Sequence, residues 1–281
     1  MEIIHTPGKM QEYALELKRQ GRTIGFVPTM GFLHEGHLSL MRIAREKCDV
    51  LVVSIFVNPA QFGPNEDLDA YPRDFARDEA LCATEGADVV FYPEPGSMYA
   101  SDASIWVDEE SLSGVLCGAS RPGHFRGVCT VVAKLFNIVQ PDWAVFGEKD
   151  AQQLRIIERM VRDLNVPVRI VRGPIVREPD GLAMSSRNKY LSDMQRANAL
   201  CLQHALAKAK ERIRNGERSA TVIRQAMCDL IEGVPGTSID YIELVDDQQL
   251  SSVECLEGTI LVALAVKTGE IRLIDNMVIK V

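Results

Sequence analysis

The chain has 281 residues, of which 46% are hydrophobic and 25% are charged, a composition typical of a globular protein and not of a disordered one. Its formal net charge of −8 disfavours electrostatic capture of nucleic acid or an anionic membrane, both of which require a densely basic surface, so we expect neither as a partner. The amino terminus lacks a signal-peptide profile, no apolar run approaches the roughly 20 residues that span a bilayer, and seven scattered cysteines form no Cys-x-x-Cys pair, so we expect a cytoplasmic protein with reduced thiols.

Short β-branched runs alternate with amphipathic stretches through the first 175 residues or so. The pattern predicts strands over 23–29, 50–57, 88–93, 143–149 and 167–171, and helices over about 8–20, 36–48, 72–86, 127–139 and 150–164. Continuous apolar strands separated by helices indicate an α/β fold with a parallel sheet covered on both faces. Such sheets bind ligands beyond the carboxyl ends of their strands.

The pattern changes after about residue 176. It predicts helices over about 192–214 and 219–232, then strands over 239–245, 259–266 and 271–281, the last two joined by turn residues at 267–270. Turn residues Pro179, Asp180 and Gly181 lie near the change. We therefore expect a Rossmann-like parallel-sheet domain over 1–176 and a smaller carboxy-terminal α+β domain over 177–281.

The stretch "PTMGFLHEGH" (28–37) sets two histidines between a strand and a helix. A zinc protease would carry its histidines four apart on a helix, whereas His34 and His37 are three apart and split by Gly36, so metal binding by this pair is disfavoured. A helix start after Gly31 favours an anion, because free backbone N–H groups and imidazoles can donate to phosphate. Taken alone, the two are equally well interpreted as ordinary loop histidines.

A second cluster is "MSSRNKYLS" (184–192), in which Ser185, Ser186 and Arg187 could close over a triphosphate. By itself it is better interpreted as a pair of helix-capping serines. In an α/β chain with an upstream His-x-Gly-His, however, it is similar to the two signatures of the nucleotidyltransferase superfamily, which includes class I aminoacyl-tRNA synthetases.

Two further clusters follow predicted strands. In "FGEKDAQQL" (146–154), Lys149 could face phosphates and Asp150 could orient a nucleotide or a metal, although a solvated lysine–aspartate corner is the simpler interpretation. Asn58 and Gln61 follow the strand at 50–57. Four polar clusters at four strand ends would converge on one side of the sheet, which a purely structural explanation accounts for poorly.

These segments together resemble the pantothenate synthetase family, the pantoate–β-alanine ligases. The matching segments are PTMGFLHEGHLSL (28–40), FVNPAQF (56–62), DLDAYPRD (67–74), RPGHFRGVCTVV (121–132), FGEKDAQQL (146–154) and MSSRN (184–188). The resemblance implies ligation of pantoate to β-alanine with ATP and Mg²⁺, through a pantoyl adenylate, in the coenzyme A pathway. It also implies a cytoplasmic homodimer whose smaller domain closes over the ATP site.

The resemblance assigns site residues by position. The ATP-binding residues would be Met30, Gly31, Phe32, Leu33, His34, Glu35, Gly36, His37, Gly147, Glu148, Lys149, Asp150, Val176, Met184, Ser185, Ser186 and Arg187. Among these, His37 is the family's assigned proton donor, and His34, Lys149 and Arg187 would share the catalytic role. Gln61 and Gln153 would bind pantoate, Gln61 and Asn58 would bind β-alanine, and Asp150 is a candidate metal ligand.

The residue types suit this chemistry. Attack of a carboxylate on the α-phosphorus joins two anions, so Lys149, Arg187 and the histidines must place positive charge or donors on the phosphates. Neutral glutamines can hold pantoate without lowering the nucleophilicity of its carboxylate. The alternatives are another adenylyltransferase of the superfamily, an aminoacyl-tRNA synthetase, which the acidic charge disfavours, and a non-catalytic nucleotide-binding protein.

Overall fold

The computed structural model describes residues 1–63 and 68–281, so Asp67, the first residue of the predicted 67–74 motif, lies outside the described residues. The described chain divides into two compact units. The first unit comprises Met1–Gly114, Gly118–Glu148 and Gln153–Pro174, and the second comprises Val115–Cys117, Lys149–Gln152 and Ile175–Val281. Each unit has its own sheet and is described separately below.

The first unit is built on a six-stranded parallel sheet in the order β1-β4-β3-β2-β5-β6. Its strands are β1 (Glu2–Ile4), β2 (Ile24–Thr29), β3 (Val50–Ile55), β4 (Val89–Phe91), β5 (Trp143–Gly147) and β6 (Arg169–Gly173). The predicted parallel sheet is confirmed, but the edge strand β1 was not predicted, because three residues are too short to show a period. Thr29 pairs with Ile55, so β2 and β3 end level with each other.

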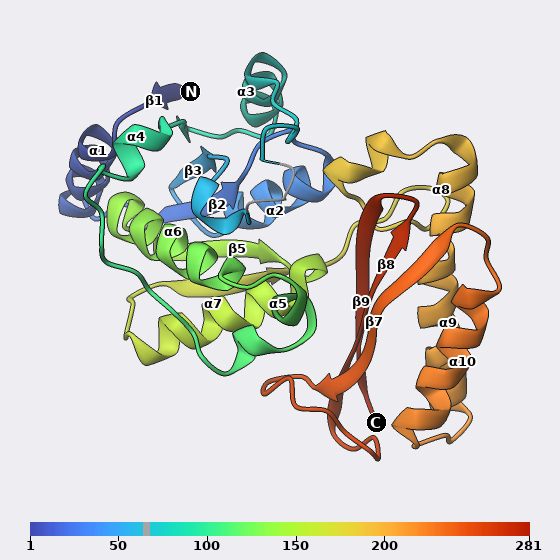
Figure 1. The fold of residues 1–281 in the computed structure, drawn as a ribbon. Helices are drawn as coiled ribbons and strands as arrows, with labels where there is room; N and C mark the ends of the chain where they lie inside the picture. The colour runs from blue at the N-terminus through green and yellow to red at the C-terminus, as the bar shows by residue number, and fades with distance from the viewer. Residues whose placement is uncertain (64–67) are drawn as a thin grey trace. The chain divides into compact units, whose positions relative to one another are not determined.

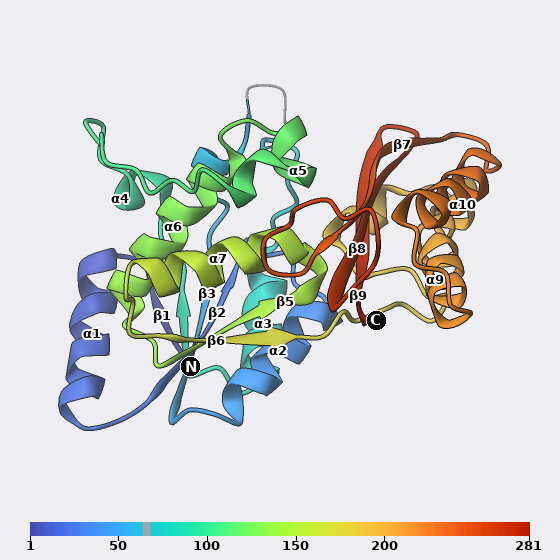
Figure 2. The ribbon, with the colours of Figure 1, turned by 90° about the horizontal axis from the view of Figure 1, so that it is seen from below.

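Helices cover both faces of this sheet. They are α1 (Pro7–Arg19), α2 (Glu35–Arg45), α3 (Phe75–Thr84), α4 (Pro95–Met98), α5 (Leu116–Ser120), α6 (His124–Val139) and α7 (Ala151–Asp163), of which α5 and α7 include residues of the second unit. Figure 2 shows α6 and α7 on one face and α2 and α3 on the other. On the α2 face, Leu40, Met41 and Ala44 pack against Val27 and Val53, and this apolar contact fixes where α2 begins.

Short 3₁₀ turns follow β3 and β5, and another lies in the loop before α5. They are η1 (Pro59–Gln61), η2 (Leu112–Gly114) and η3 (Glu148–Asp150). The predicted strand 143–149 therefore stops at Gly147, and the chain turns at the two residues that were expected to finish it. As a result, the polar clusters after β2, β3 and β5 lie just beyond strand ends, as predicted, whereas the cluster 184–192 lies in the second unit and does not directly follow a strand.

The second unit is a three-stranded antiparallel sheet, β7-β8-β9, packed against two helices. Its elements are η4 (Ser186–Tyr190), α8 (Asp193–Ala199), α9 (Cys201–Arg214), α10 (Ala220–Glu232), β7 (Thr237–Asp246), β8 (Thr259–Thr268) and β9 (Ile271–Lys280). Figure 1 shows α9 and α10 running along this sheet, and Ile223 and Met227 of α10 join Leu264 of β8 in its core. The predicted helix 192–214 is interrupted at Leu200, so it forms α8 and α9.

The predicted fold class, a Rossmann-like parallel-sheet domain with a smaller α+β unit, is confirmed. Among residues 1–63 and 68–281, no helix combines the length and the apolar character needed to cross a membrane.

Candidate active site

The loop after β2 has a backbone that few residues tolerate. Gly31 and Phe32 both have positive φ, of 84° and 50°, and the Gly31 N–H donates to Thr29 Oγ1 at 3.1 Å. A Cβ on Gly31 would lie 3.0 Å from a carboxylate oxygen of Asp78 and 3.0 Å from Ile55 Cγ2. Glycine is therefore required here both by backbone conformation and by space.

A buried carboxylate holds this loop. Asp78 of α3 is 1% exposed, and its two oxygens accept the N–H groups of Phe32 at 2.6 Å and Leu33 at 2.7 Å. Desolvation raises the pKa of Asp78, although the two N–H bonds and the nearby Arg77 guanidinium act in the opposite direction. The sequence analysis did not single out Asp78, because nothing in a helical pattern marks an aspartate whose partners lie 45 residues away.

The two histidines form a reciprocal cap at the start of α2. His34 is the N-cap residue, its Nδ1 accepts the Gly36 N–H at 3.2 Å, and the Nδ1 of His37 accepts the His34 N–H at 3.3 Å. A neutral imidazole accepts at one nitrogen and carries its proton on the other, so both neutral rings are protonated at Nε2. The ring centroids are 4.1 Å apart, which places the two rings side by side.

Most backbone N–H groups of the loop are already bonded within the protein. Internal acceptors are bonded by the N–H groups of Gly31, Phe32, Leu33, His34, Gly36 and His37. The expectation that free N–H groups at the helix start receive a phosphate is therefore not met at these positions. The bonds at Nδ1 place the ring hydrogens of both histidines on Nε2, from which each imidazole could donate to an anion.

Two other residues of the predicted ATP stretch already have protein partners. Leu33 is fully buried in the core of the first unit. The Glu35 carboxylate is held by the Arg42 guanidinium at 2.7 and 2.9 Å, and these bonds lower the pKa of Glu35 below its usual range. Arg42 also donates to the Glu85 carboxylate at 2.9 and 3.1 Å, so a single guanidinium is shared by two carboxylates and offsets the charge of Glu35 only in part.

Asn58 is a buried residue that makes four hydrogen bonds, one of them to Gln61. It is 1% exposed, and its Nδ2 donates to Gln61 Oε1 at 3.2 Å and to the Gly127 carbonyl at 3.1 Å. Its Oδ1 accepts the Ala60 N–H at 3.3 Å and the Tyr99 hydroxyl at 2.9 Å. These four bonds use both donors and both acceptors of the amide. The geometry therefore favours an indirect role, in which Asn58 orients Gln61, over the predicted direct contact of Asn58 with β-alanine.

Gln61 is fixed at both its side chain and its backbone. Its Nε2 lies 3.1 Å from Met30 Sδ, and its carbonyl is 2.8 Å from the Nδ1 of His124. Arg121 reaches the His124 Nε2 at 3.1 Å, so His124 accepts there and donates from Nδ1. The segment 121–132, which the sequence analysis matched but gave no role, thus supports the predicted pantoate residue.

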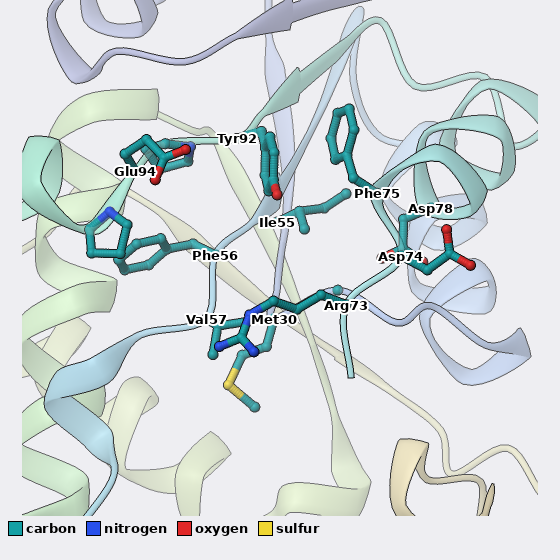
Figure 3. A pocket seen from close by; sticks show the side chains of 13 residues that line it. Met30, Ile55, Phe56, Val57, Arg73, Asp74, Phe75, Asp78, Tyr92 and Glu94 are labelled. Atoms are coloured by element: carbon teal, nitrogen blue, oxygen red, sulfur yellow. The ribbon is translucent and has the colours of Figure 1, made fainter. Parts of the chain in front are cut away.

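A pocket of about 250 Å³ opens at the ends of β2, β3 and β4 (Figure 3). Its lining includes Met30 and Gly31 from the predicted ATP stretch, Phe56 and Arg73 from matched segments in which they were given no role, and Glu94, which lies outside the matched segments. Charged and apolar side chains alternate around it, with Glu94 near Phe56 on one side and Asp78 near Phe75 on the other. The pocket lies where a doubly wound sheet is expected to bind a ligand.

The glutamines after Lys149 have different surroundings. Gln152 is 6% exposed, accepts the Cys117 N–H at 3.0 Å and donates to the Val115 carbonyl at 2.7 Å, so it is bound within the second unit. Gln153, the predicted pantoate residue, is half-buried in the first unit. Lys149 Nζ lies 3.9 Å from an oxygen of the half-exposed Asp150.

A short hairpin of the second unit brings two predicted ATP residues together. The Met184 N–H donates to the Val176 carbonyl at 3.0 Å, and the Glu178 N–H donates to the Leu182 carbonyl at 2.8 Å. Ser185 then accepts the Arg187 N–H at 3.3 Å and starts η4. The serine cap expected for an ordinary helix start is therefore present, and it also places Arg187 directly after the hairpin.

The acidic residues suit a metal ion that is bound mainly through the phosphates of a nucleotide. Within the described ranges, no group of three or more His, Cys, Asp and Glu residues is arranged to hold a metal ion. Asp150 is a single, half-exposed carboxylate. Magnesium commonly binds one or two carboxylates together with substrate phosphates and water, so Asp150 fits an ion that arrives with a nucleotide.

Comparison with known proteins gives matches over the full chain. The sequence model of the family described as Pantoate-beta-alanine ligase matches residues 2–278. Proteins named pantothenate synthetase from Heliobacterium modesticaldum and Thermosipho melanesiensis are each 57% identical, over 281 residues (100% of both chains) and 279 residues (99% of both chains) respectively.

Solved structures agree with the sequence matches. The crystal structure of pantothenate synthetase from Thermus thermophilus has a TM-score of 0.93 at 44% identity, over 99% of both chains. A pantoate-beta-alanine ligase from Francisella tularensis, described as complexed with beta-gamma ATP and beta-alanine, has a TM-score of 0.77 at 34% identity, over 99% of this chain and 97% of that one. The chain therefore belongs to the pantoate–β-alanine ligase family.

Proposed function

We propose that the protein joins pantoate to β-alanine in an ATP-dependent reaction that passes through pantoyl adenylate. The observation that carries the proposal is the set of polar side chains held in place just beyond the ends of β2 and β3. There, the imidazoles of His34 and His37 follow β2, and the anchored amide of Gln61 follows the neighbouring strand β3. The two imidazoles suit a polyphosphate, and the amide of Gln61 suits a small hydroxy acid.

In the first step, a carboxylate oxygen of pantoate bonds to the α-phosphorus of ATP while the bond from that phosphorus to pyrophosphate breaks. The Nε2–H groups of His34 and His37 would donate to the phosphates, and in the second unit Lys149 and Arg187 would supply positive charge. The other residues proposed for ATP are Met30 through Gly36, Gly147, Glu148, Asp150, Val176 and Met184 through Ser186. The charge on the leaving pyrophosphate is thereby matched by donors.

Pantoate would be held by Gln61 and Gln153. Each amide offers donors to the carboxylate and an acceptor to the substrate hydroxyls without neutralising the nucleophile. Asn58 Nδ2 donates a hydrogen bond to Gln61 Oε1 at 3.2 Å, and this bond orients the Gln61 side chain before a substrate binds. Such preorganisation gives the nucleophile a defined approach.

Magnesium would accompany ATP, with Asp150 as one carboxylate ligand. Mg²⁺ neutralises phosphate charge when it is bound. In the second step, the nitrogen of β-alanine bonds to the acyl carbon, AMP leaves with its phosphate, and the amine loses one proton. Water must be excluded in the meantime, and Met184 through Arg187 are proposed for that task.

The direct test is exchange of labelled pyrophosphate into ATP by the purified protein with Mg²⁺ and without an amine. We expect exchange only when pantoate is present, followed by AMP and pantothenate once β-alanine is added. Exchange that is independent of pantoate would favour another adenylyltransferase. Silence in both assays would favour a non-catalytic nucleotide-binding protein.

The homodimer and the cytoplasmic location that the family resemblance implies are also proposals. Sedimentation of the purified protein over a range of concentrations tests the first, and fractionation of the source cells tests the second. The domain boundary between residues 176 and 177 is tested by limited proteolysis.

A further inference from the structure

Strand β9 carries two successive buried polar side chains that the proposed reaction does not use. Asp275 is 3% exposed and Asn276 is 5% exposed. Successive side chains of a strand point to opposite faces of its sheet, so the two reach different parts of the second unit. Burying such groups is costly unless they make directed bonds, so their partners indicate their role.

Asp275 anchors the hairpin of residues 176–184. The Arg177 guanidinium donates to both carboxylate oxygens of Asp275, at 2.7 and 3.0 Å, and the Asn276 N–H donates to one of them at 2.8 Å. Arg177 also donates to the Gly181 carbonyl at 3.1 Å, across the turn of the hairpin. The bidentate pair therefore fixes both the position and the angle of the hairpin.

The second strand of the hairpin is bonded to the residues that flank the proposed ATP segment, residues 184–187. The Asn188 Nδ2 donates to the Ala183 carbonyl at 3.0 Å and to Glu178 Oε1 at 2.6 Å, and Arg196 pairs with Glu178. Residues 184–187 lie between Ala183 and Asn188. Their backbone is therefore held at both ends by the anchored hairpin.

Asn276 anchors the turn that carries Lys149. Its Nδ2 donates to the Lys149 carbonyl at 2.9 Å. Lys149 has a flexible side chain of four methylene groups, so the place of its ammonium group depends on where its backbone is fixed. The hydrogen bond to the Lys149 carbonyl fixes the backbone from which this side chain extends.

We propose that Asp275 and Asn276 are positioning residues that set, from one strand, the two segments of the second unit assigned to ATP: Lys149 and residues 184–187. The inference rests on the proposed function, because that function assigns these segments to ATP. A purely stabilising role explains the Arg177–Asp275 ion pair less well. Replacing such an ion pair with apolar groups of similar volume is often neutral or stabilising.

The test compares Asn276→Leu and Asp275→Asn with a matched control, Asp240→Asn. The first removes the donor to the Lys149 carbonyl without adding charge, and the second weakens the bidentate pair. The control breaks the Arg272–Asp240 pair of the same sheet, with bonds of 2.9 and 2.7 Å, which contacts neither ATP segment in any bond described above. The readouts are pantoate-dependent pyrophosphate exchange, calorimetric binding of Mg·ATP, and the melting temperature.

We expect Asn276→Leu and Asp275→Asn to lower kcat/KM for ATP by about 100-fold, the scale of a misplacement near 1 Å. The KM for pantoate should stay unchanged, because Gln61 and Gln153, the two residues assigned to pantoate, both belong to the first unit. Asp240→Asn should match the wild type in every kinetic constant. Variants that equal this control in both ATP affinity and exchange would overturn the positioning role while leaving the ligase proposal intact.

A double variant separates positioning from stability. Arg177→Met with Asp275→Leu fills the same space with apolar groups, so it should recover the melting temperature without recovering exchange. Recovery of both would show that the pair only stabilises the fold. If the wild type binds Mg·ATP but shows no pantoate-dependent exchange, the proposed function fails, and weaker ATP binding by Asn276→Leu still supports the positioning role.

Discussion

The hydrogen bonds of His34 and His37 limit the chemistry that these side chains can perform. Protonation of either Nδ1 would break a bond from a backbone N–H, so the reciprocal cap favours the neutral rings. A neutral ring donates a hydrogen bond from Nε2 readily but gives up that proton poorly. We therefore expect His37 to stabilise charge on pyrophosphate as a donor, and not to protonate it as the family role implies.

Two substitutions at His37 distinguish these roles. The amide of His37→Gln can place an N–H near the position of Nε2, whereas His37→Asn can keep an acceptor near Nδ1 but has no donor at Nε2. We expect His37→Gln to retain exchange within about 10-fold of the wild type, and His37→Asn and His37→Ala to lose at least about 100-fold. Equal loss in the glutamine and asparagine variants, measured by pyrophosphate exchange, would favour a proton donor.

Asp78 predicts a pH dependence of ATP binding. Because desolvation raises its pKa, the carboxyl becomes protonated at milder acidity than an ordinary aspartate, and it then loses an acceptor for the Phe32 or Leu33 N–H. We expect the affinity for Mg·ATP to fall as the pH drops through the mildly acidic range. In Asp78→Asn the affinity should be low at neutral pH and should lack this component of the titration.

The same group has the opposite effect on folding. A carboxyl whose pKa is higher in the folded than in the unfolded chain binds its proton more tightly when folded, so its contribution to the unfolding free energy increases as the pH falls. Calorimetric titration of ATP beside denaturant unfolding at each pH separates the two effects. A loss of affinity that parallels a loss of stability in the wild type would contradict this account.

The close approach of α6 to η1 shows how packing between elements places a substrate residue. A Cβ on Gly127 would fall on the Ala60 carbonyl and would lie 2.7 Å from the Gln61 Cα. Glycine therefore lets the helix lie directly against the turn, and its carbonyl then receives Asn58 Nδ2. In the sequence this residue was part of a matched segment, but no periodicity marks a glycine that serves a contact with another element.

Gly127→Ala should displace Gln61. Overpacking of this kind costs about 1–3 kcal/mol of unfolding free energy, and we expect the KM for pantoate in pyrophosphate exchange to rise with it. Gly8→Ala in α1 is the matched control, since a Cβ there meets nothing within 4 Å. It should stabilise the protein slightly by its helix propensity. Unchanged pantoate kinetics in Gly127→Ala would refute the link between this contact and Gln61.

The two units have separate apolar cores, which predicts unfolding transitions that do not coincide. Leu264 and Ile223 belong to the core of the second unit, whereas Met41 and Val53 belong to that of the first. Both tryptophans of the chain, Trp106 and Trp143, lie in the first unit, so fluorescence reports on that unit while far-ultraviolet circular dichroism reports on both.

Ile223→Ala should weaken the second unit by about 2–5 kcal/mol, because it opens a cavity at a fully buried site of α10. The circular dichroism transition should then begin at lower denaturant while the tryptophan transition stays in place. Met41→Ala in α2 should move the tryptophan transition instead. Coincident transitions in both variants would mean that the units unfold as one.

Local patterns were sufficient to predict the layout of the chain. Continuous apolar strands such as β2 and β3 carry their signal in neighbouring residues, so their type and order could be predicted. The edge strand β1 and the break at Leu200 were missed, because one is too short for a period and the other leaves the hydrophobic pattern intact. The polar clusters after β2, β3 and β5 could also be found beforehand, since each directly follows an apolar strand.

The contacts that fix the site were decided by the tertiary structure. Asp78 clamps a loop 45 residues away, Asn58 meets Gly127, and Asn276 reaches the Lys149 carbonyl. Such partners are joined by the packing of distant elements, and a linear pattern carries no record of which buried donor will face which acceptor. Residue types therefore revealed the chemistry, and long-range hydrogen bonds determined its geometry.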